Sequence, residues 1–387
     1  MSLHIESLVF DEFRGYSHLE LSNLSALTVI EGDNAVGKTN IVEGIQLLSS
    51  GTSFRKPAWG ETVSWGQNRA RLSARFSDGK RLVEHVLTIS GNERVYEVNG
   101  KRKPASAVGQ TCPCVLFIPD DLQLVKASSA ARRAALDDVG VQLSRSYASL
   151  KGDYQQVLRQ RNLLVRDGIS DPVLLASWNE SLAVAGARLA VNRWRLLERL
   201  AGHFERIYAE LVDGERAWLR YIPSWERFDE TGRQVAVDAA CDPDMLHEAP
   251  EVEEAEERLL DCMQRFSEVE SRRKASLFGP HKDELAFYIA GKNARMFASQ
   301  GQQRTLVLAF KLACVELVGE VVEQNPILLL DDVMSELDAA HRSALSNFVA
   351  QAAQTFMTTA NLGYFEDGLL ARADVVHVPI PGTRHAY

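Results

Sequence analysis

The sequence predicts an α/β protein whose middle is interrupted by an inserted, mainly helical lobe. Three observations support this fold class: strand-like segments with short turns up to residue 126, helical periodicity over most of 127–275, and alternating helices and strands in 276–387. No internal repeat or low-complexity tract interrupts this order. We therefore expect 1–126 and 276–387 to build one α/β lobe and 127–275 to form the second.

The composition is that of a folded protein without a membrane segment. A chain of 387 residues with 45% hydrophobic residues can bury one large core or two ordinary ones. No apolar run approaches the roughly 20 residues that span a bilayer. The N-terminal segment carries acidic residues where a secretory signal has a basic stretch and an apolar core. We expect a cytoplasmic protein without membrane contact.

Cysteine usage and charge exclude little more. The five cysteines are odd in number and form no C-x-x-C pair, which argues against a disulfide framework and a tetrahedral zinc site. Cys112 and Cys114 precede the apolar run VLFIP and are interpreted as small residues entering a buried strand. The net charge of −9 counts against non-specific polyanion binding. It leaves nucleic acid open, because a local basic stripe decides that interaction.

The N-terminal part should contain mostly β-strands. Asp-Gly and Asn-Gly pairs in SDGK and VNGK predict tight hairpin turns, since both pairs accept positive φ. These hairpins imply an antiparallel sheet beside the sheet that carries the first glycine-rich loop. The expected strands cover 4–13, 26–32, 70–79, 81–91, 94–102 and 114–121.

The remaining elements follow from periodicity. Apolar spacings of three and four predict long amphipathic helices, a helical bundle too short for an extended coiled coil. A strand pair with a linker is expected in 211–250, and a turn with a hairpin in 279–297. The expected helices cover 131–167, 173–212, 251–276, 301–324 and 336–353, and the late strands cover 326–332, 355–360 and 375–380.

A glycine-rich loop follows the strand at 26–32. Gly32-Asp33-Asn34-Ala35-Val36-Gly37-Lys38-Thr39 fits the pattern G-x-x-x-x-G-K-[ST] between a buried strand and a helix. Such a loop turns successive backbone amides inward, and the helix adds its positive dipole end. Lys38 can reach the β- and γ-phosphates, and the Thr39 hydroxyl can bind Mg²⁺. The loop, continued to Asn40, is the predicted ATP site, with Lys38 also assigned to catalysis.

Two distant motifs complete this reading. The apolar run PILLLDD ends in Asp331 and Asp332, and a buried strand ending in Asp places a carboxylate beside Mg²⁺ in a P-loop domain. Asp331 is the predicted metal carboxylate, and Asp332 is placed to orient or deprotonate an attacking water. In SQGQQR, Ser299 and Gly301 stand at the start of a helix, where they either make a second anion site or form a serine N-cap with a glycine turn.

Together the three motifs resemble the ATP-binding-cassette superfamily in its DNA-repair branch. The chain is similar to the RecF family over essentially its whole length. The residues that carry this resemblance are FDEFRGY, GDNAVGKTNIVEGI, LFIPDDLQLVKASSAARRAALD, LRQRN, GPHKDELAF, SQGQQRTLVLAFKLA and LLLDDVMSELD.

The resemblance implies an ABC-type ATPase head that forms an ATP-dependent homodimer. The signature residues Ser299, Gly301 and Gln302 would complete the nucleotide site of the opposite protomer. The closed dimer would clamp duplex DNA at gaps or stalled forks and support RecA loading with RecR and RecO, in recombinational repair and the SOS response. These partners and the cofactors ATP and Mg²⁺ are expectations that the resemblance supplies.

The sequence departs from the superfamily pattern at two places. Many cassette ATPases carry a histidine after the strand that follows the paired aspartates, whereas this chain offers Thr358, Thr359 and Asn361. The glutamine that usually lies between sheet and helical lobe has only Gln123 as a candidate. Weak or slow hydrolysis would fit both departures. Stimulation of hydrolysis by DNA is a further expectation from the resemblance.

Further basic residues have open interpretations. Arg14 and Arg55 either touch a nucleotide or phosphate backbone or are solvated surface side chains. For His281 a role in a turn is expected, because no second histidine or cysteine lies nearby to hold a metal. The candidate DNA-facing residues are Arg132, Arg133, Arg272, Arg273 and Lys274.

Two other functional classes remain as alternatives. A small-metabolite kinase would share the glycine-rich loop, but it needs a lid and an acceptor pocket and has no use for the SQGQQR helix. A non-enzymatic ATP-gated scaffold would retain the binding residues and lose hydrolysis. The intact pair Asp331 and Asp332 disfavours that alternative.

Overall fold

The computed structural model groups the chain into two compact units. One comprises Met1–Leu122 with Cys314–Tyr387, and the other Gln123–Ala313. The sequence predicted boundaries at 126/127 and 275/276. The segment 276–313 instead belongs to the second unit, where its strand Glu284–Ile289 pairs with Ala217–Ile222. The residues described are 3–109, 111–167, 171–229, 231, 233, 235–237, 240–242, 248–349, 354–378 and 384–385.

The first unit contains a parallel sheet of five strands in the order β14-β3-β13-β12-β8. Its three middle strands are almost wholly buried, as the continuous apolar sequences predicted. Cys112 and Cys114 are buried at the start of the edge strand β8, which confirms their interpretation. The strands are β3 (Leu27–Glu31), β8 (Cys114–Phe117), β12 (Ile327–Asp331), β13 (Gln354–Thr359) and β14 (Asp374–His377).

A second sheet in the same unit is antiparallel, with the order β15-β2-β1-β4-β5-β6-β7. Both expected hairpins form, and Asn99 and Gly100 adopt positive φ of 48° and 72° in the second turn. The sequence reading did not include β2 and β15. The strands are β1 (His4–Phe13), β2 (Tyr16–Ser22), β4 (Arg69–Ser77), β5 (Leu82–Ser90), β6 (Glu93–Val98), β7 (Lys101–Lys103) and β15 (Arg384–His385).

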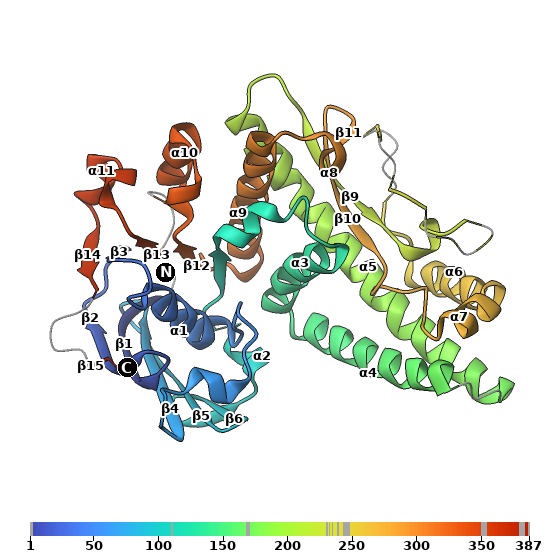
Figure 1. Ribbon diagram of the computed structural model, residues 1–387, viewed down its shortest axis with the longest axis horizontal. Helices are drawn as coiled ribbons and strands as arrows, with labels where there is room; N and C mark the ends of the chain where they lie inside the picture. The colour runs from blue at the N-terminus through green and yellow to red at the C-terminus, as the bar shows by residue number, and fades with distance from the viewer. Residues whose placement is uncertain are drawn as a thin grey trace. The chain divides into compact units, whose positions relative to one another are not determined.

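Helix α1 (Lys38–Ser50) packs against strands of both sheets (Figure 1). One apolar cluster therefore joins the two sheets through this helix and fixes the position of its N-terminus. Helix α10 begins at Ala339, later than expected, because Asp338 accepts the His341 amide as a cap. The other short elements are α2 (Ala105–Val108), α10 (Ala339–Val349), α11 (Asp367–Leu370), η1 (Trp59–Thr62), η2 (Pro119–Gln123), η5 (Val333–Glu336) and η6 (Leu362–Tyr364).

The second unit is mainly helical around α5, which packs against α3, α4, α6 and the strand β9 (Figure 1). Asp171 caps the N-terminus of α5 by accepting the amides of Val173 and Leu174. The expected single helix over 251–276 is instead two helices, because the backbone leaves helical geometry at Phe266. The helices are α3 (Ser129–Leu143), α4 (Arg145–Asp167), α5 (Pro172–Leu211), α6 (Val252–Arg265) and α7 (Ser267–Arg273).

A three-stranded antiparallel sheet completes the second unit. Strand β9 (Ala217–Ile222) pairs along its whole length with β10 (Glu284–Ile289), so the local strand pair expected within 211–250 is replaced by a long-range one. The hairpin from β10 to β11 (Lys292–Asn293) forms as expected. It leads into α8 (Ala294–Phe297) and α9 (Gln300–Val322), and η3 (Ser224–Glu226) follows β9. Among the described helices, none has an apolar stretch that could cross a bilayer.

Candidate nucleotide-binding site

The glycine-rich loop connects β3 to α1 in the first unit. Gly37 has φ 107°, and a Cβ there would lie 2.7 Å from the Tyr16 hydroxyl, so only glycine fits. A Cβ on Gly32 would lie 2.4 Å from the carbonyl oxygen of Val378. Ala35 also has a positive φ of 68°. Left-handed residues within a turn are the backbone units of an anion nest, so the loop geometry suits phosphate.

Lys38 begins α1 and folds back over the loop that precedes it. Its ammonium group donates to the carbonyl oxygens of Gly32 at 2.7 Å and Asp33 at 2.8 Å. The side chain is 7% exposed, so its charge sits inside the curve of the loop. Among the described residues, the acceptors of this buried ammonium are neutral carbonyl groups, so it is well placed to gain from a phosphate anion.

Thr39 is held against the end of β12. Its hydroxyl donates to Oδ1 of Asp331 at 3.1 Å, and the Thr358 hydroxyl donates to the same oxygen at 2.7 Å. These contacts bring together two residues that are 292 positions apart in sequence. A hydroxyl beside a buried carboxylate supplies the hard oxygen ligands that Mg²⁺ prefers, so the residues fit that ion.

Asp332 follows in a left-handed conformation, with φ 53°. Its amide donates to the Thr358 hydroxyl at 2.9 Å, which fixes the backbone. Its Oδ1 is buried and has no hydrogen-bond partner in the described part of the chain. Burial raises the pKa of this carboxyl and Asp331 raises it further, while Lys38 opposes both. A carboxylate with an unused acceptor and a raised pKa suits a proton acceptor.

Thr358 stands at the end of β13, which lies between β3 and β12 in the sheet. Thr358 and Thr359 stand where many cassette ATPases carry a histidine. Thr358 instead contacts both aspartate residues, and Thr359 donates to the carbonyl oxygen of Asn361 at 3.0 Å. Thr358 therefore acts on the site by holding the two aspartates.

Arg14 and Arg55 meet at a carboxylate that the sequence reading missed. Glu43, on α1 and with no exposed surface, accepts from Arg14 at 2.8 and 3.0 Å and from Arg55 at 3.1 Å. Arg55 also donates to Oδ1 of Asn40 at 2.8 Å. Neither arginine is simply a solvated surface residue. A glutamate in the middle of an amphipathic helix gives no sequence signal that it is buried.

The signature residues lie at the start of α9 in the second unit. The Ser299 hydroxyl accepts the Gln302 amide at 3.2 Å, and Oε1 of Gln302 accepts the Ser299 amide at 3.0 Å. This reciprocal pair is a capping box. Gln302 also donates to Glu215 at 3.1 Å. Ser299 and Gly301 are exposed, and a Cβ on Gly301 would come no closer than 4.0 Å to the Ser299 hydroxyl.

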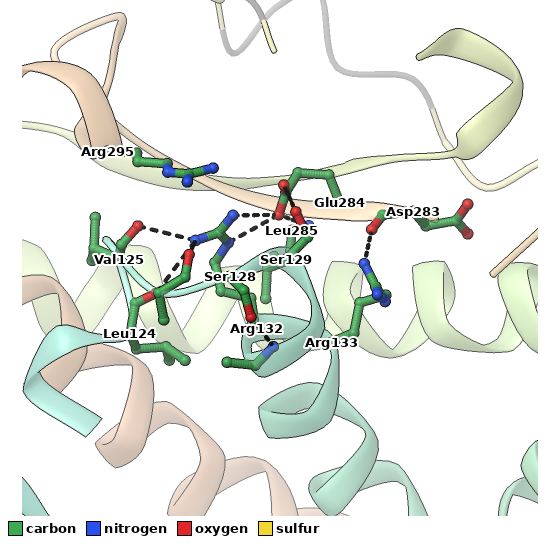
Figure 2. Close-up of polar contacts among 12 residues, drawn as sticks. Leu124, Val125, Ser128, Ser129, Arg132, Arg133, Asp283, Glu284, Leu285 and Arg295 are labelled. Carbon is green, nitrogen blue, oxygen red and sulfur yellow. Dashed lines mark hydrogen bonds and ion pairs between the residues drawn. The ribbon is translucent and has the colours of Figure 1, made fainter. Parts of the chain in front are cut away.

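The candidate DNA-facing residues differ sharply in exposure. Arg132 is 2% exposed and pairs with Glu284 at 2.8 Å, so the structure does not leave it a surface from which to contact DNA (Figure 2). Arg133 is half-buried and donates to the carbonyl oxygen of Asp283 at 2.6 Å. Arg272, Arg273 and Lys274, at the end of α7, are exposed.

Two further residues are placed by the structure. Gln123 is exposed at the end of η2. His281 hydrogen-bonds to the Tyr154 hydroxyl at 2.5 Å and to the carbonyl oxygen of Ser276 at 3.0 Å. Burial lowers the pKa of its imidazole to about 4, so the ring is neutral at physiological pH. His281 is a structural residue that joins α4 to the segment before β10.

The sequence profile described as "RecF/RecN/SMC N terminal domain" matches residues 4–377. The chain belongs to the RecF/RecN/SMC family. A "DNA replication and repair protein RecF" of Symbiobacterium thermophilum is 36% identical over 93% of this chain and 92% of its own. A RecF protein of Gloeobacter violaceus is 33% identical over 97% of both chains. The resemblance to RecF read from the sequence is confirmed.

Solved structures agree with this assignment. A structure described as "the recombination mediator protein RecF-ATPrS in RecFOR pathway" has a TM-score of 0.83 and 26% identity, covering 94% of both chains. The Smc head domain from Pyrococcus furiosus matches with a TM-score of 0.52 and 17% identity, which is a likeness of fold alone. The predicted α/β ATPase-head fold with a helical insert is confirmed.

Proposed function

We propose that this chain is an ATP-hydrolysing, DNA-binding protein of replication and recombinational repair. The observation that carries the proposal is the contact between Thr39 and Asp331, because it joins the glycine-rich loop to the strand that ends in two aspartates. Relatives over nearly the whole chain are described as RecF, and a similar structure is described with ATP.

Within one copy, each residue of the site has a distinct role. The loop from Gly32 to Asn40 binds the phosphates through backbone amides, and Lys38 exchanges its carbonyl partners for phosphate oxygens. Thr39 and Asp331 would hold Mg²⁺, which when bound neutralises phosphate charge. Asp332 orients the attacking water and accepts its proton.

A second copy of the chain supplies the remainder of the site. Ser299, Gly301 and Gln302 of that copy bind the γ-phosphate side of the nucleotide, so ATP bridges two protomers. The exposure of Ser299 and Gly301 supports this role, because among the described residues the nearest atom to a Cβ at 301 is the Ser299 hydroxyl at 4.0 Å, so packing there does not require glycine. Dimer formation therefore depends on ATP.

The closed dimer clamps duplex DNA at single-strand gaps or stalled forks. We include support of RecA loading with RecR and RecO, and a part in the SOS response, because the relatives are RecF proteins. Arg272, Arg273 and Lys274 are the exposed candidates for phosphate contacts, with Arg133 a weaker one. A cytoplasmic location accompanies this function.

ATP hydrolysis measured with and without gapped duplex DNA tests the proposal. Slow turnover that rises with gapped duplex, and that falls in Asp332→Asn, is expected. Phosphate transfer from ATP to a small metabolite would favour a kinase. ATP binding with no turnover under either condition would favour a non-enzymatic scaffold.

A further inference from the structure

A cavity of about 490 Å³ opens in the second unit. It lies where the loop before α3 meets β10 and α8, and this volume is in the range of ligand-binding pockets. Every described residue that lines it belongs to the second unit. Those that matter for its chemistry are Arg132, Arg227, Glu284, Phe287, Arg295 and Met296.

One side of the cavity is a closed ion pair. Glu284 accepts from Arg132 at 2.8 and 2.9 Å, from the Leu285 amide at 3.0 Å and from the Ser129 hydroxyl (Figure 2). Arg132 also donates to the carbonyl oxygen of Val125 at 3.1 Å. Glu284 is the lone carboxylate among the described lining residues, and Arg132 already neutralises it.

Two further lining residues, Arg227 and Arg295, give the cavity a net positive charge. Arg227 is 8% exposed and donates to the carbonyl oxygen of Lys282 at 2.7 Å, while its ion pair to Glu284 is long, at 4.0 Å. Its Nε is buried without an acceptor among the described residues. Burial lowers the pKa of Arg227, and the like charges of Arg132 and Arg295 lower it further, against Glu284 and Asp283.

Arg295 also lines the cavity. Its side chain is exposed, and its charge acts on that of Arg227 (Figure 2 shows Arg295 beside α3 and β10). Beside it on α8, Met296 is 56% exposed, and Phe287 and Val125 add apolar lining to the cavity. An anion entering here meets one buried and one exposed guanidinium, and any apolar group that accompanies it meets Met296.

We propose that this pocket binds an acidic, apolar segment of a partner protein. A carboxylate of that segment lies between Arg227 and Arg295, and a neighbouring apolar side chain covers Met296. Charge complementarity carries the choice of ligand, since guanidinium groups pair with carboxylates through parallel hydrogen bonds. A DNA backbone fits less well, because its phosphates are contacted by exposed basic side chains and Arg227 is enclosed.

The position of the pocket gives an occupant influence over the nucleotide site. Met296 lies three residues before Ser299, and Val125 lies two residues after Gln123. A bound segment would contact the chain directly beside both, and so alter how the signature residues are presented. This consequence rests on the proposed function, whereas binding of the segment does not.

Selection from a displayed library of random peptides of about seven residues tests the binding directly. The full chain is the target, and the Arg295→Glu variant is the counter-target. We expect enriched peptides that pair Asp or Glu with Leu, Ile, Met or Phe. Measured by fluorescence anisotropy, their affinity should fall at least about tenfold in Arg295→Glu. In Arg188→Glu, an exposed charge reversal on α5, affinity should stay within about twofold.

Buried Arg227 provides the second variant. Arg227→Gln should lose the same peptides, with thermal unfolding used to verify that the fold persists. If this variant does not fold, Met296→Glu replaces it, because an exposed carboxylate at the mouth repels the ligand without disturbing the core.

Three outcomes overturn the proposal. In the first, no selected peptide binds the parent chain more tightly than Arg295→Glu. In the second, the enriched peptides carry no acidic residues. In the third, the peptides bind the parent and every variant with equal affinity. A duplex oligonucleotide is measured in parallel and should bind Arg295→Glu as it binds the parent. Loss of duplex affinity in that variant, with peptide affinity retained, would assign the pocket to DNA instead. If the selected peptides bind but leave the rate of ATP hydrolysis by the parent chain unchanged, only the link to the nucleotide site is contradicted.

Discussion

The two phosphate-binding motifs differ in how far their own unit occupies them. In the first unit, Lys38 donates to two loop carbonyls, and Asp331 accepts from both Thr39 and Thr358. In the second unit, Ser299 caps its own helix, and Gly301 is exposed. In the first motif Lys38, Thr39 and Asp331 have partners within their own unit, whereas in the second motif Ser299 and Gly301 remain exposed.

This difference predicts different consequences of substitution. A change in the first motif should already be visible in a single copy of the chain, because its hydrogen bonds lie within one unit. A change in the second should be invisible until two copies meet on ATP. Variants of each motif therefore test whether the two motifs differ in this way.

The largest effect on the chemical step itself is expected for Asp332→Asn. The substitution preserves size and removes the proton acceptor, so hydrolysis should fall by about 100-fold or more while ATP binding and dimerisation persist. Steady-state phosphate release and equilibrium nucleotide binding measure the two quantities. Turnover at the parental rate would place the catalytic carboxylate elsewhere.

The pH dependence of hydrolysis offers a further test of Asp332. A base works when deprotonated, and burial raises the pKa of this carboxyl above that of an ordinary aspartate. Activity should therefore decline on acidification at a higher pH than an unperturbed aspartate would give. A rate that stays flat well into the acidic range, with the fold intact, would contradict the assignment.

Lys38→Met should come next. It removes the ammonium that faces the β- and γ-phosphates, and a charge-assisted hydrogen bond contributes about 1.5–3 kcal/mol. ATP affinity of the isolated copy should fall by about tenfold to a hundredfold. Titration with a fluorescent ATP analogue measures this, and circular dichroism verifies the fold. Unchanged affinity would remove the glycine-rich loop from the nucleotide site.

Ser299→Arg tests the second motif. A bulky cation at an exposed helix start should leave folding nearly intact, as well as ATP binding by the glycine-rich loop of a single copy (first-site binding). It should abolish ATP-driven dimerisation and hydrolysis. Light scattering with and without ATP measures the dimer. A mixture of Ser299→Arg and Lys38→Met protein retains one intact composite site in the heterodimer, so partial recovery of activity is expected. Unaltered dimerisation in both single variants would refute a site shared between copies.

The sequence was informative wherever function imposes a local pattern. The glycine-rich loop, the apolar strand ending in Asp331 and Asp332, and the hairpin turns all depend on short-range chemistry. The break at Phe266 was missed because the helical periodicity continues through it. The pairing of β9 with β10 joins segments more than 60 residues apart, which no local pattern specifies.

The burial of charged side chains was the other feature that the sequence did not predict. Arg132 was expected to face DNA, yet Glu284, 152 residues away in sequence, encloses it in an ion pair. Arg14 and Arg55 likewise converge on buried Glu43. A charged residue signals exposure unless its partner is known, and the partner is set by tertiary structure.

The affinity for duplex DNA should change less on single substitutions than on a rise in salt concentration. Any clamp on DNA must release counterions, so duplex affinity should fall steeply with salt and rise with ATP. Replacing exposed Arg272 and Arg273 by glutamine should reduce the slope of log affinity against log salt by about two. Arg188→Gln is the matched control. An unchanged slope would move the DNA contacts to another surface.

The smallest effect is expected for Glu215→Gln. The Glu215 carboxylate accepts from Gln302 at 3.1 Å and from the Tyr208 hydroxyl at 2.9 Å, so it holds the signature glutamine in place from within the second unit. The neutral isostere retains the shape and loses the charge of one acceptor, a change of about 1 kcal/mol. The ATP concentration needed for dimerisation should rise by about fivefold, because only the orientation of Gln302 is weakened.

First-site ATP affinity in Glu215→Gln should remain at the parental value, since the substitution lies outside the first unit. Tyr208→Phe is the matched control, as it removes the other hydrogen bond to Glu215 and leaves the contact with Gln302. We expect its dimerisation to lie between those of the parent and Glu215→Gln. If Glu215→Gln weakens first-site ATP binding as much as dimerisation, the separation between a self-contained loop and an outward-facing signature does not hold.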